Sequence, residues 1–291
     1  MAFSSLDDLV NKMSLGQTTG PTVWNKLVPA AHTAGRWYDF SPLAGTPIAN
    51  AWAGTALNWV TCTESAGNGT QIFGIRHGGD VAAATKHLIN AMATTPGVVP
   101  GVLMLVDMQG YYPGISLNSA TAQTLVGTPA LRYTNGVGVR AFMVCTTAPG
   151  ATAHNIAYSY TNQAGTAGRA NPVTVAATAS AINSHIVHSG TAANNYGPFL
   201  PLAGGDSGMQ SVQTITISAA SGSGAAALVF ARPIAIMPLT TAGVACERDF
   251  VNQLPSLPRI IDGACLTWLY FAGGTTASST NFYGSIEAAW G

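Results

Sequence analysis

The chain of 291 residues carries 11 Lys and Arg against 11 Asp and Glu, so charged residues make up 8% and the formal net charge is zero. An ordinary soluble domain has about 25% charged residues. The neutral balance argues against sequence-independent binding of nucleic acid, because phosphate neutralisation requires clustered Lys and Arg. With 47% hydrophobic residues the chain can bury a large core. So few charges would keep a free monomer poorly soluble, and we therefore expect much of the surface to face other subunits.

Neither a leader nor a membrane span is expected. Residues Met1 to Asp8 contain no basic segment and no apolar segment of the kind found in secretory signals, so we expect synthesis in the cytoplasm. The longest apolar stretch, Ala225 to Leu239, is interrupted by Arg232, Pro233 and Pro238. A transmembrane helix needs about 20 uninterrupted apolar residues.

Two short helices are predicted in the first third of the chain. Ser5 begins a capping-box-like start, and apolar residues at helical spacing continue to Gly16. A Gly-, Pro- and Thr-rich segment follows, so we interpret residues 1–35 as an N-terminal helix and arm. The second helix is predicted from Val81 to Met92, where apolar residues again recur at helical spacing and Pro96 stops the pattern.

The remaining pattern is β. Apolar residues alternate with small polar ones from Ile156 to Tyr160 and from Ile215 to Ile217, and residues 227–230 form a compact apolar run. The 33 Gly and 16 Pro residues support many tight turns. We predict a mainly β fold, an antiparallel sandwich or jelly-roll-like arrangement with two short helices and the N-terminal arm. The β body covers residues 36–291, and a division of it near residues 121–132 stays open.

One stretch resembles a catalytic motif. Gly205-Asp206-Ser207-Gly208 matches the core of the nucleophile motif of trypsin-like serine proteases, and His32 and Asp107 precede it in the matching chain order. His32 would be the general base, Asp107 its orienting group and Ser207 the nucleophile. However, Met209 stands where that family has a further glycine for its oxyanion pocket. We favour a β-turn in which Asp206 bonds its own backbone, we expect no enzyme, and a serine hydrolase remains the minor alternative.

Other polar clusters give no convincing site. His185 and His188 lack a third metal ligand nearby in the sequence. The loop from Arg76 to Asp80 lacks the G-K-[ST] ending of a phosphate-binding loop, and we interpret Asp80 as a helix N-cap. No catalytic, cofactor-binding or metal-binding residue is therefore assigned, and no cofactor is expected. The cysteines form no C-x-x-C pair and are predicted to be buried free thiols. They are Cys62, Cys145, Cys246 and Cys265.

Aromatic and charged residues have two interpretations each. The aromatic residues could line a sugar or peptide site, but core and interface packing is favoured. They are Trp37, Tyr38, Tyr111, Tyr112, Trp268, Tyr270 and Trp290. Charges are rare, so Arg248 with Asp249 and Arg259 with Asp262, beside the Pro-rich stretch at residues 254–258, are predicted to form fixed ion pairs. Such pairs would fix a subunit contact or stay within the chain.

Several strings taken together resemble a family of uncharacterised virion structural proteins of tailed bacteriophages. The likeness spans nearly the whole chain, but none of the strings is a catalytic signature, so no catalytic residue carries over. The strings are Ala34-Gly-Arg-Trp-Tyr-Asp-Phe40, His77-Gly-Gly-Asp-Val81 with Lys86-His-Leu88, Tyr160-Thr-Asn-Gln-Ala-Gly-Thr-Ala-Gly-Arg169, Glu247-Arg-Asp249 with Asn252-Gln-Leu-Pro-Ser-Leu-Pro-Arg259, and Phe282-Tyr-Gly284 with Trp290-Gly291.

The resemblance implies a component of the virion, made in the host cytoplasm. We favour a capsid decoration or cement protein that stabilises the head by bridging subunits, with a major capsid protein or a tail or fibre component as alternatives. The expected partners are further copies of the chain in a homo-oligomer, for which a trimer is one arrangement, and capsid or other virion proteins. No direct contact with nucleic acid or membrane is expected. Residues 1–35 would reach a neighbouring subunit, or else fold back on their own domain.

Overall fold

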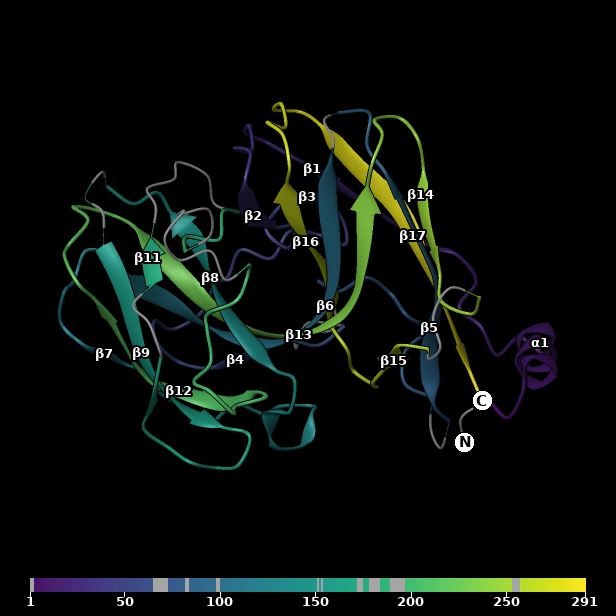
Figure 1. Cartoon of the computed structure of the whole chain (residues 1–291), viewed down its shortest axis with the longest axis horizontal. Coiled ribbons are helices and arrows are strands. Elements are labelled where there is room, and N and C mark those ends of the chain that lie inside the picture. Colours follow the sequence, from purple (N-terminus) through teal and green to yellow (C-terminus); the bar gives the residue numbers. More distant parts are fainter. Residues whose placement is uncertain are drawn as a thin grey trace.

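The computed structural model describes residues 3–64, 73–81, 84–97, 100–150, 152, 154–171, 175–177, 184–188, 197–252 and 257–291. These residues form antiparallel sheets that pack into a sandwich-like arrangement (Figure 1). The predicted mainly β fold is confirmed. The strands expected around residues 156–160, 215–217 and 227–230 all lie within observed strands.

Three sheets make up the body. The terminal sheet has the order β14 (Cys246–Asp249), β5 (Lys86–Thr94), β17 (Asn281–Trp290), β1 (Thr22–Leu27) and β3 (Ala44–Thr46), and β15 (Arg259–Ile260) also pairs with β5. The central sheet has the order β2 (Arg36–Asp39), β16 (Leu266–Ala272), β6 (Gly101–Ser116), β13 (Ala225–Leu239) and β8 (Arg140–Thr147), and β4 (Val60–Thr61) also pairs with β6. The distal sheet has the order β10 (Arg169–Ala170), β9 (His154–Asn162), β12 (Met209–Ile217) and β7 (Gln123–Thr124), and β11 (Val175–Ala177) also pairs with β9.

The long strands β6 and β13 run through two lobes of the molecule. The terminal lobe is built on the terminal sheet and the distal lobe on the distal sheet, and both pack on the central sheet. Near one end, Leu103 and Leu105 of β6 face the core shared with the terminal sheet, and near the other end Tyr112 and Ile115 face the core shared with the distal sheet. Register shifts interrupt the pairing of β13 with β6, and bulges of this kind increase the local twist of a sheet. Both lobes share β6 and β13, so these two strands connect the terminal and distal sheets to one central sheet.

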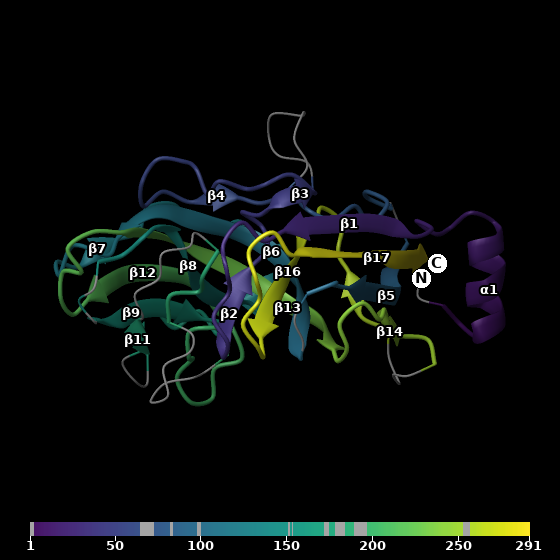
Figure 2. The same ribbon diagram turned by 90° about the horizontal axis from the view of Figure 1, so that it is seen from above.

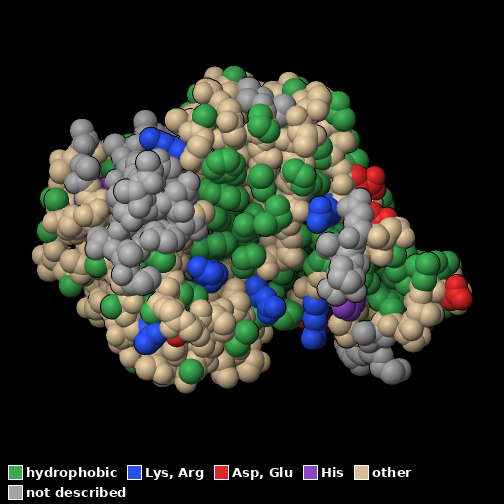
Figure 3. All heavy atoms as spheres, viewed as in Figure 1, with side chains coloured by type: hydrophobic (Ala, Val, Ile, Leu, Met, Phe, Trp, Pro, Cys, Tyr) green, Lys and Arg blue, Asp and Glu red, His purple; other side chains and the backbone are tan. Residues whose placement is uncertain are grey.

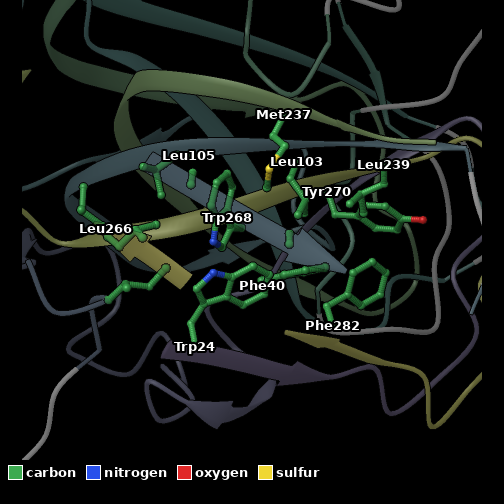
Figure 4. Close-up of a cluster of buried hydrophobic side chains, with 14 of the residues drawn as sticks. Trp24, Phe40, Leu103, Leu105, Met237, Leu239, Leu266, Trp268, Tyr270 and Phe282 are labelled. Carbon is green, nitrogen blue, oxygen red and sulfur yellow. The ribbon is translucent and has the colours of Figure 1, made fainter. Parts of the chain in front are cut away.

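The core of the terminal lobe is rich in aromatic residues (Figure 4). Trp24 of β1 and Trp268 of β16 are almost completely buried, with ring centroids 5.6 Å apart. Phe282 of β17 packs 4.9 Å from Phe40. Burying one large aromatic ring removes about 150–250 Å² from water, which stabilises the fold by roughly 4–6 kcal/mol before entropy costs. The sandwich of the central and terminal sheets therefore depends strongly on β1.

A helix stands at the end of this lobe. Helix α1 (Leu6–Ser14) begins at Ser5, whose Oγ accepts a hydrogen bond from the Asp8 backbone N–H at 3.0 Å, so the first predicted helix is confirmed. Leu9 packs on Ile89 and Ala289 of the terminal sheet, beside the C-terminus (Figure 2). The stretch after α1 is not entirely irregular, since β1 lies between β17 and β3. No described helix is long and apolar enough to cross a membrane.

The second predicted helix is wrong, because β5 occupies most of that segment. A bulge opposite Glu287 and Ala288 turns both Leu88 and Ala91 toward the core, although three positions separate them. In a regular strand, residues an odd number apart face opposite sides. The bulge therefore reproduces, within a strand, the spacing that predicts a helix. Residues 82–83 of the predicted helix lie outside the described residues.

Candidate functional site

The residues of the protease-like triad do not work together. His32 is completely buried, its ring stacks on Tyr38 at 3.7 Å, and neither ring nitrogen has a hydrogen-bond partner in the described part of the chain. Asp107 pairs with Arg132, with 2.5 Å between Oδ1 and Nη2. A general base must approach its nucleophile to within about 3.2 Å. His32 therefore has neither the orienting contact nor the nucleophile contact that a triad needs.

The turn that carries Ser207 has a structural network instead. Asp206 accepts hydrogen bonds from Tyr160 Oη at 2.5 Å, Asn162 Nδ2 at 2.8 Å and Arg169 Nε at 3.0 Å. These bonds, with the one from Tyr160 the largest influence, lower the pKa of Asp206. Ser207 itself is exposed. The turn is thus anchored through the side chain of Asp206 to β9 and β10, rather than to its own backbone as expected.

The two histidines that are not assigned as metal ligands, His185 and His188, are both buried. His188 Nε2 accepts a hydrogen bond from the Met143 backbone N–H at 3.3 Å, whereas both nitrogens of His185 lack partners among the described residues. Burial lowers the pKa of each histidine to about 3. No set of three His, Cys, Asp or Glu side chains within the described ranges is placed to hold a metal ion.

The loop at residues 76–80 connects strands rather than capping a helix. Asp80 Oδ1 accepts a hydrogen bond from the Gly263 N–H at 2.7 Å, so its predicted role as a helix N-cap is wrong. Buried His77 lies between Lys86 Nζ, 2.8 Å from Nδ1, and the Ala264 carbonyl, 2.9 Å from Nε2. Burial lowers the pKa of both His77 and Lys86. This polar cluster holds the loop against the start of β16.

The cysteines and most of the aromatic residues behave as packing residues. Cys62, Cys145 and Cys265 are buried, Cys246 is half-buried, and all four are free. Burial raises the pKa of Cys145 to about 11, which makes its thiol unreactive at neutral pH. The core interpretation of the aromatic residues is confirmed for the buried ones. These are Trp37, Tyr38, Tyr111, Tyr112, Trp268 and Tyr270.

The predicted ion pairs of the C-terminal region are wrong. Asp249 accepts hydrogen bonds from Asn252, and Asp262 lies 3.9 Å from Lys86 Nζ. Within the described ranges, neither Arg248 nor Arg259 lies within 4.0 Å of a carboxylate oxygen. Part of the Pro-rich stretch, residues 254–256, lies outside the described residues. Sequence proximity did not identify the partners, because strand pairing directs adjacent charges to different neighbours.

Several charges are directed into the interior. Lys26 Nζ donates hydrogen bonds to the carbonyls of Leu43 at 3.1 Å and Pro47 at 2.7 Å, and burial lowers its pKa to about 8. Asp39 is completely buried against Ser41, and burial raises its pKa to about 6. Together with the Asp107–Arg132 pair, these residues remove charge from the surface. The exterior is therefore poorer in charge than the composition alone indicates.

The outer face of the terminal sheet, the face turned away from the central sheet, exposes apolar side chains. Val23 is 69%, Leu27 37%, Met92 36% and Tyr283 44% exposed. The strand register places Val23 and Met92 on either side of Ser285, so these residues lie across three adjacent strands. Helix α1 covers only the end of this face. We name Val23, Leu27, Met92 and Tyr283 the outer apolar face.

A second apolar area lies on the opposite side of the same lobe. In the central sheet, Phe271, Val102 and Pro238 occupy one row across three strands, and Phe271 and Val102 also pack against the buried cluster that contains Trp37. Ile236, beside this row, is 51% exposed. Figure 3 shows hydrophobic side chains gathered between the two lobes over this part of the central sheet. The lobe thus presents apolar surface on both outer sides, a feature that marks interaction sites more often than free monomer surfaces.

Comparison of the chain with protein-family models, with curated proteins and with solved structures finds no match. Sequence analysis missed the outer apolar face, although one signal was present. In the run from Val23 to Val28, inward Trp24 and Val28 are flanked by outward Val23 and Leu27, so both sides of β1 are apolar.

Proposed function

We propose that this protein is a structural component of a tailed-bacteriophage virion, specifically a decoration or cement protein that stabilises the head by bridging capsid subunits. In this role it acts as a homo-oligomer and contacts other virion proteins, and it binds neither nucleic acid nor membrane directly. A protein that binds the assembled shell and not its separated parts lowers the free energy of the assembled state.

The outer apolar face is the observation that carries this proposal. Stable protein interfaces bury about 1,200–2,000 Å² in total, and their centres are depleted of charged residues. Val23, Leu27, Met92 and Tyr283 provide an uncharged centre on the exposed side of the sheet. The second apolar area, around Ile236, gives the same lobe another contact on its opposite side. Two such contacts suit a subunit that touches more than one neighbour.

Two carboxylates beside the outer apolar face are placed to fix the orientation of a partner protein on it. Glu247 accepts a hydrogen bond from Asn90 Nδ2 at 2.5 Å, and Glu287 accepts one from Thr18 Oγ1 at 3.2 Å. These carboxylates lie on the strands beside the apolar residues. Fixed charges at the rim of an apolar contact select orientation more than they add affinity. A major capsid protein or a tail or fibre component would use similar surfaces, so the position in the particle distinguishes these alternatives.

A density map of the phage particle that contains this protein tests the proposal. We expect copies of the chain on the outside of the head, each bridging at least two capsid subunits, with the outer apolar face or the Ile236 area buried. Sedimentation of the purified protein should show a homo-oligomer. Density within the shell lattice or in the tail would favour the corresponding alternative. A protein that stays monomeric at high concentration and is absent from the particle would contradict a structural role.

A further inference from the structure

Two arginines without an internal carboxylate partner line a pocket of about 290 Å³ between β13 and β15. Arg232 and Arg259 provide the positive charge, Tyr133 contributes its ring, and Pro233, Ile234 and Ile261 form apolar walls. Only 11 cationic residues occur in the whole chain, so two of them in one small pocket is a concentrated use of charge.

The side chain of Arg232 is held in place. Its guanidinium carbon lies 4.2 Å from the centre of the Tyr133 ring, a cation–π contact. On another side is Gly138, where an added Cβ would come 3.2 Å from Arg232 Nε. The backbone of Gly138 has φ +76°, which favours glycine. Because the guanidinium is packed before any ligand arrives, little side-chain entropy is lost on binding.

The chain supplies no anion of its own to this pocket. All 11 carboxylates lie in the described ranges, and none comes within 4.0 Å of a nitrogen of Arg232 or Arg259. Every carboxylate except that of Asp7 accepts a hydrogen bond from another group of the chain. Asp7 lies in the first turn of α1, which packs against the end of the terminal sheet. A carboxylate that pairs with either arginine would therefore come from outside the chain.

We propose that this pocket binds a carboxylate carried on a short aliphatic stem. Guanidinium groups match the planar geometry of a carboxylate and form paired, charge-assisted hydrogen bonds with it. The walls formed by Pro233, Ile234 and Ile261 would contact the stem. A volume of about 290 Å³ is at the lower end for ligand pockets, which suits one acidic side chain or a small dicarboxylate. This proposal stands independently of the virion role.

Calorimetric titration with three probes tests the assignment. The probes are glutarate, the N-methylamide of N-acetylglutamate, which presents one carboxylate as a protein side chain does, and inorganic phosphate. We expect saturable binding of both carboxylate probes and weaker binding of phosphate. Tighter binding of the glutamate derivative would identify a protein side chain as the source, and tighter binding of glutarate a free dicarboxylate. Either result supports the carboxylate site, whereas a preference for phosphate, or no saturable binding, would overturn it.

Four variants assign the binding to the pocket. Arg232→Gln and Arg259→Gln should each weaken the carboxylate probes about tenfold or more, the loss expected for one charge-assisted pair. Arg76→Gln removes an exposed arginine outside the pocket and should leave the affinity unchanged. Arg232→Lys retains the charge without the planar fork and should give an intermediate affinity, with far-UV circular dichroism reporting that each variant is folded. Equal losses in Arg76→Gln and the pocket variants would reject the site.

Discussion

The terminal and distal sheets pack on the same central sheet but present different outer faces. On the distal sheet, outward positions carry amides and hydroxyls, and Gln213 Nε2 donates hydrogen bonds to Thr161 Oγ1 at 2.8 Å and Ser211 Oγ at 2.9 Å. On the terminal sheet, the corresponding positions include Val23 and Tyr283, both strongly exposed. An antiparallel sheet with one solvated face usually alternates apolar and polar residues, as the distal sheet does.

The two sheets therefore differ in what replaces charged residues on their outer faces. The outer face of the distal sheet carries neutral polar groups that hydrogen-bond to one another and are compatible with contact to water. The terminal sheet leaves apolar side chains uncovered, and burying such surface on association stabilises a complex. The low charge of the chain therefore has a distinct meaning on each sheet. It reflects neutral hydrogen bonding on the distal sheet, and under the proposed function it leaves the terminal sheet with an apolar face for protein contact.

The largest effect is expected from the inner side of the terminal sheet. Trp24→Ala should lower the free energy of unfolding by about 3–5 kcal/mol, because it removes a completely buried ring and leaves a cavity against Trp268. Tyr283→Ala changes an exposed ring on the opposite side of the same sheet and should alter it by about 0.5 kcal/mol or less. Urea denaturation followed by far-UV circular dichroism measures both. Similar losses in the two variants would show that the two sides of the sheet do not differ in this way.

The second-largest effect on stability is expected at acidic pH, through three buried histidines that contact the central sheet. Burial lowers the pKa of His32, His185 and His188 to about 3, whereas an unfolded histidine titrates near 6.5. The unfolded state therefore binds protons first, and stability that is complete above pH 6.5 is lost as the pH falls toward 3. Between pH 6.5 and 5 the expected loss is about 1–2 kcal/mol per histidine. Asp39, whose pKa is raised to about 6, has the opposite sign and offsets about one histidine.

Urea denaturation at pH 7 and pH 5 measures this loss. His185→Phe provides the control, because both nitrogens of His185 lack hydrogen-bond partners among the described residues. The variant should be less sensitive to acid by about 1–2 kcal/mol, the share of one histidine. An unchanged stability of the parent protein between these pH values would mean that the three histidines titrate normally in the folded state.

Sequence reasoning was reliable where the strand pattern was regular. The alternation from Ile156 to Tyr160 correctly predicted β9, and the apolar run at residues 227–230 correctly predicted part of β13. It failed at β5, where a bulge places Leu88 and Ala91 on one side and imitates a helix. Such a bulge depends on the pairing with β17, nearly two hundred positions later in the chain, and local spacing carries no information about it.

The candidate sites show the same limit. The spacing of His32, Asp107 and Ser207 matched a triad in chain order, but the fold buries His32 beside Tyr38 and gives Asp107 to Arg132. Conversely, Arg232 and Arg259 are far apart in the sequence and meet only because their strands form the walls of one pocket. The local sequence linked these two arginines only through the proline that stands beside each of them. Residue type predicted which groups are costly to bury, but only the strand pairing decides which groups meet.

The smallest change in stability, and the sharpest contrast between the sheets, is expected from lysine placed on each outer face. Val23→Lys on the terminal sheet and Ala157→Lys on the distal sheet both replace exposed strand residues, so each should change the free energy of unfolding by about 0.5 kcal/mol or less. Their effects on association should differ. A lysine in an apolar contact must lose its hydration on binding, so Val23→Lys should weaken self-association about tenfold or more, whereas Ala157→Lys should leave it unchanged. Sedimentation equilibrium over a concentration series measures both, and equal weakening by the two lysines would remove the distinction between a protein-facing terminal sheet and a water-facing distal sheet.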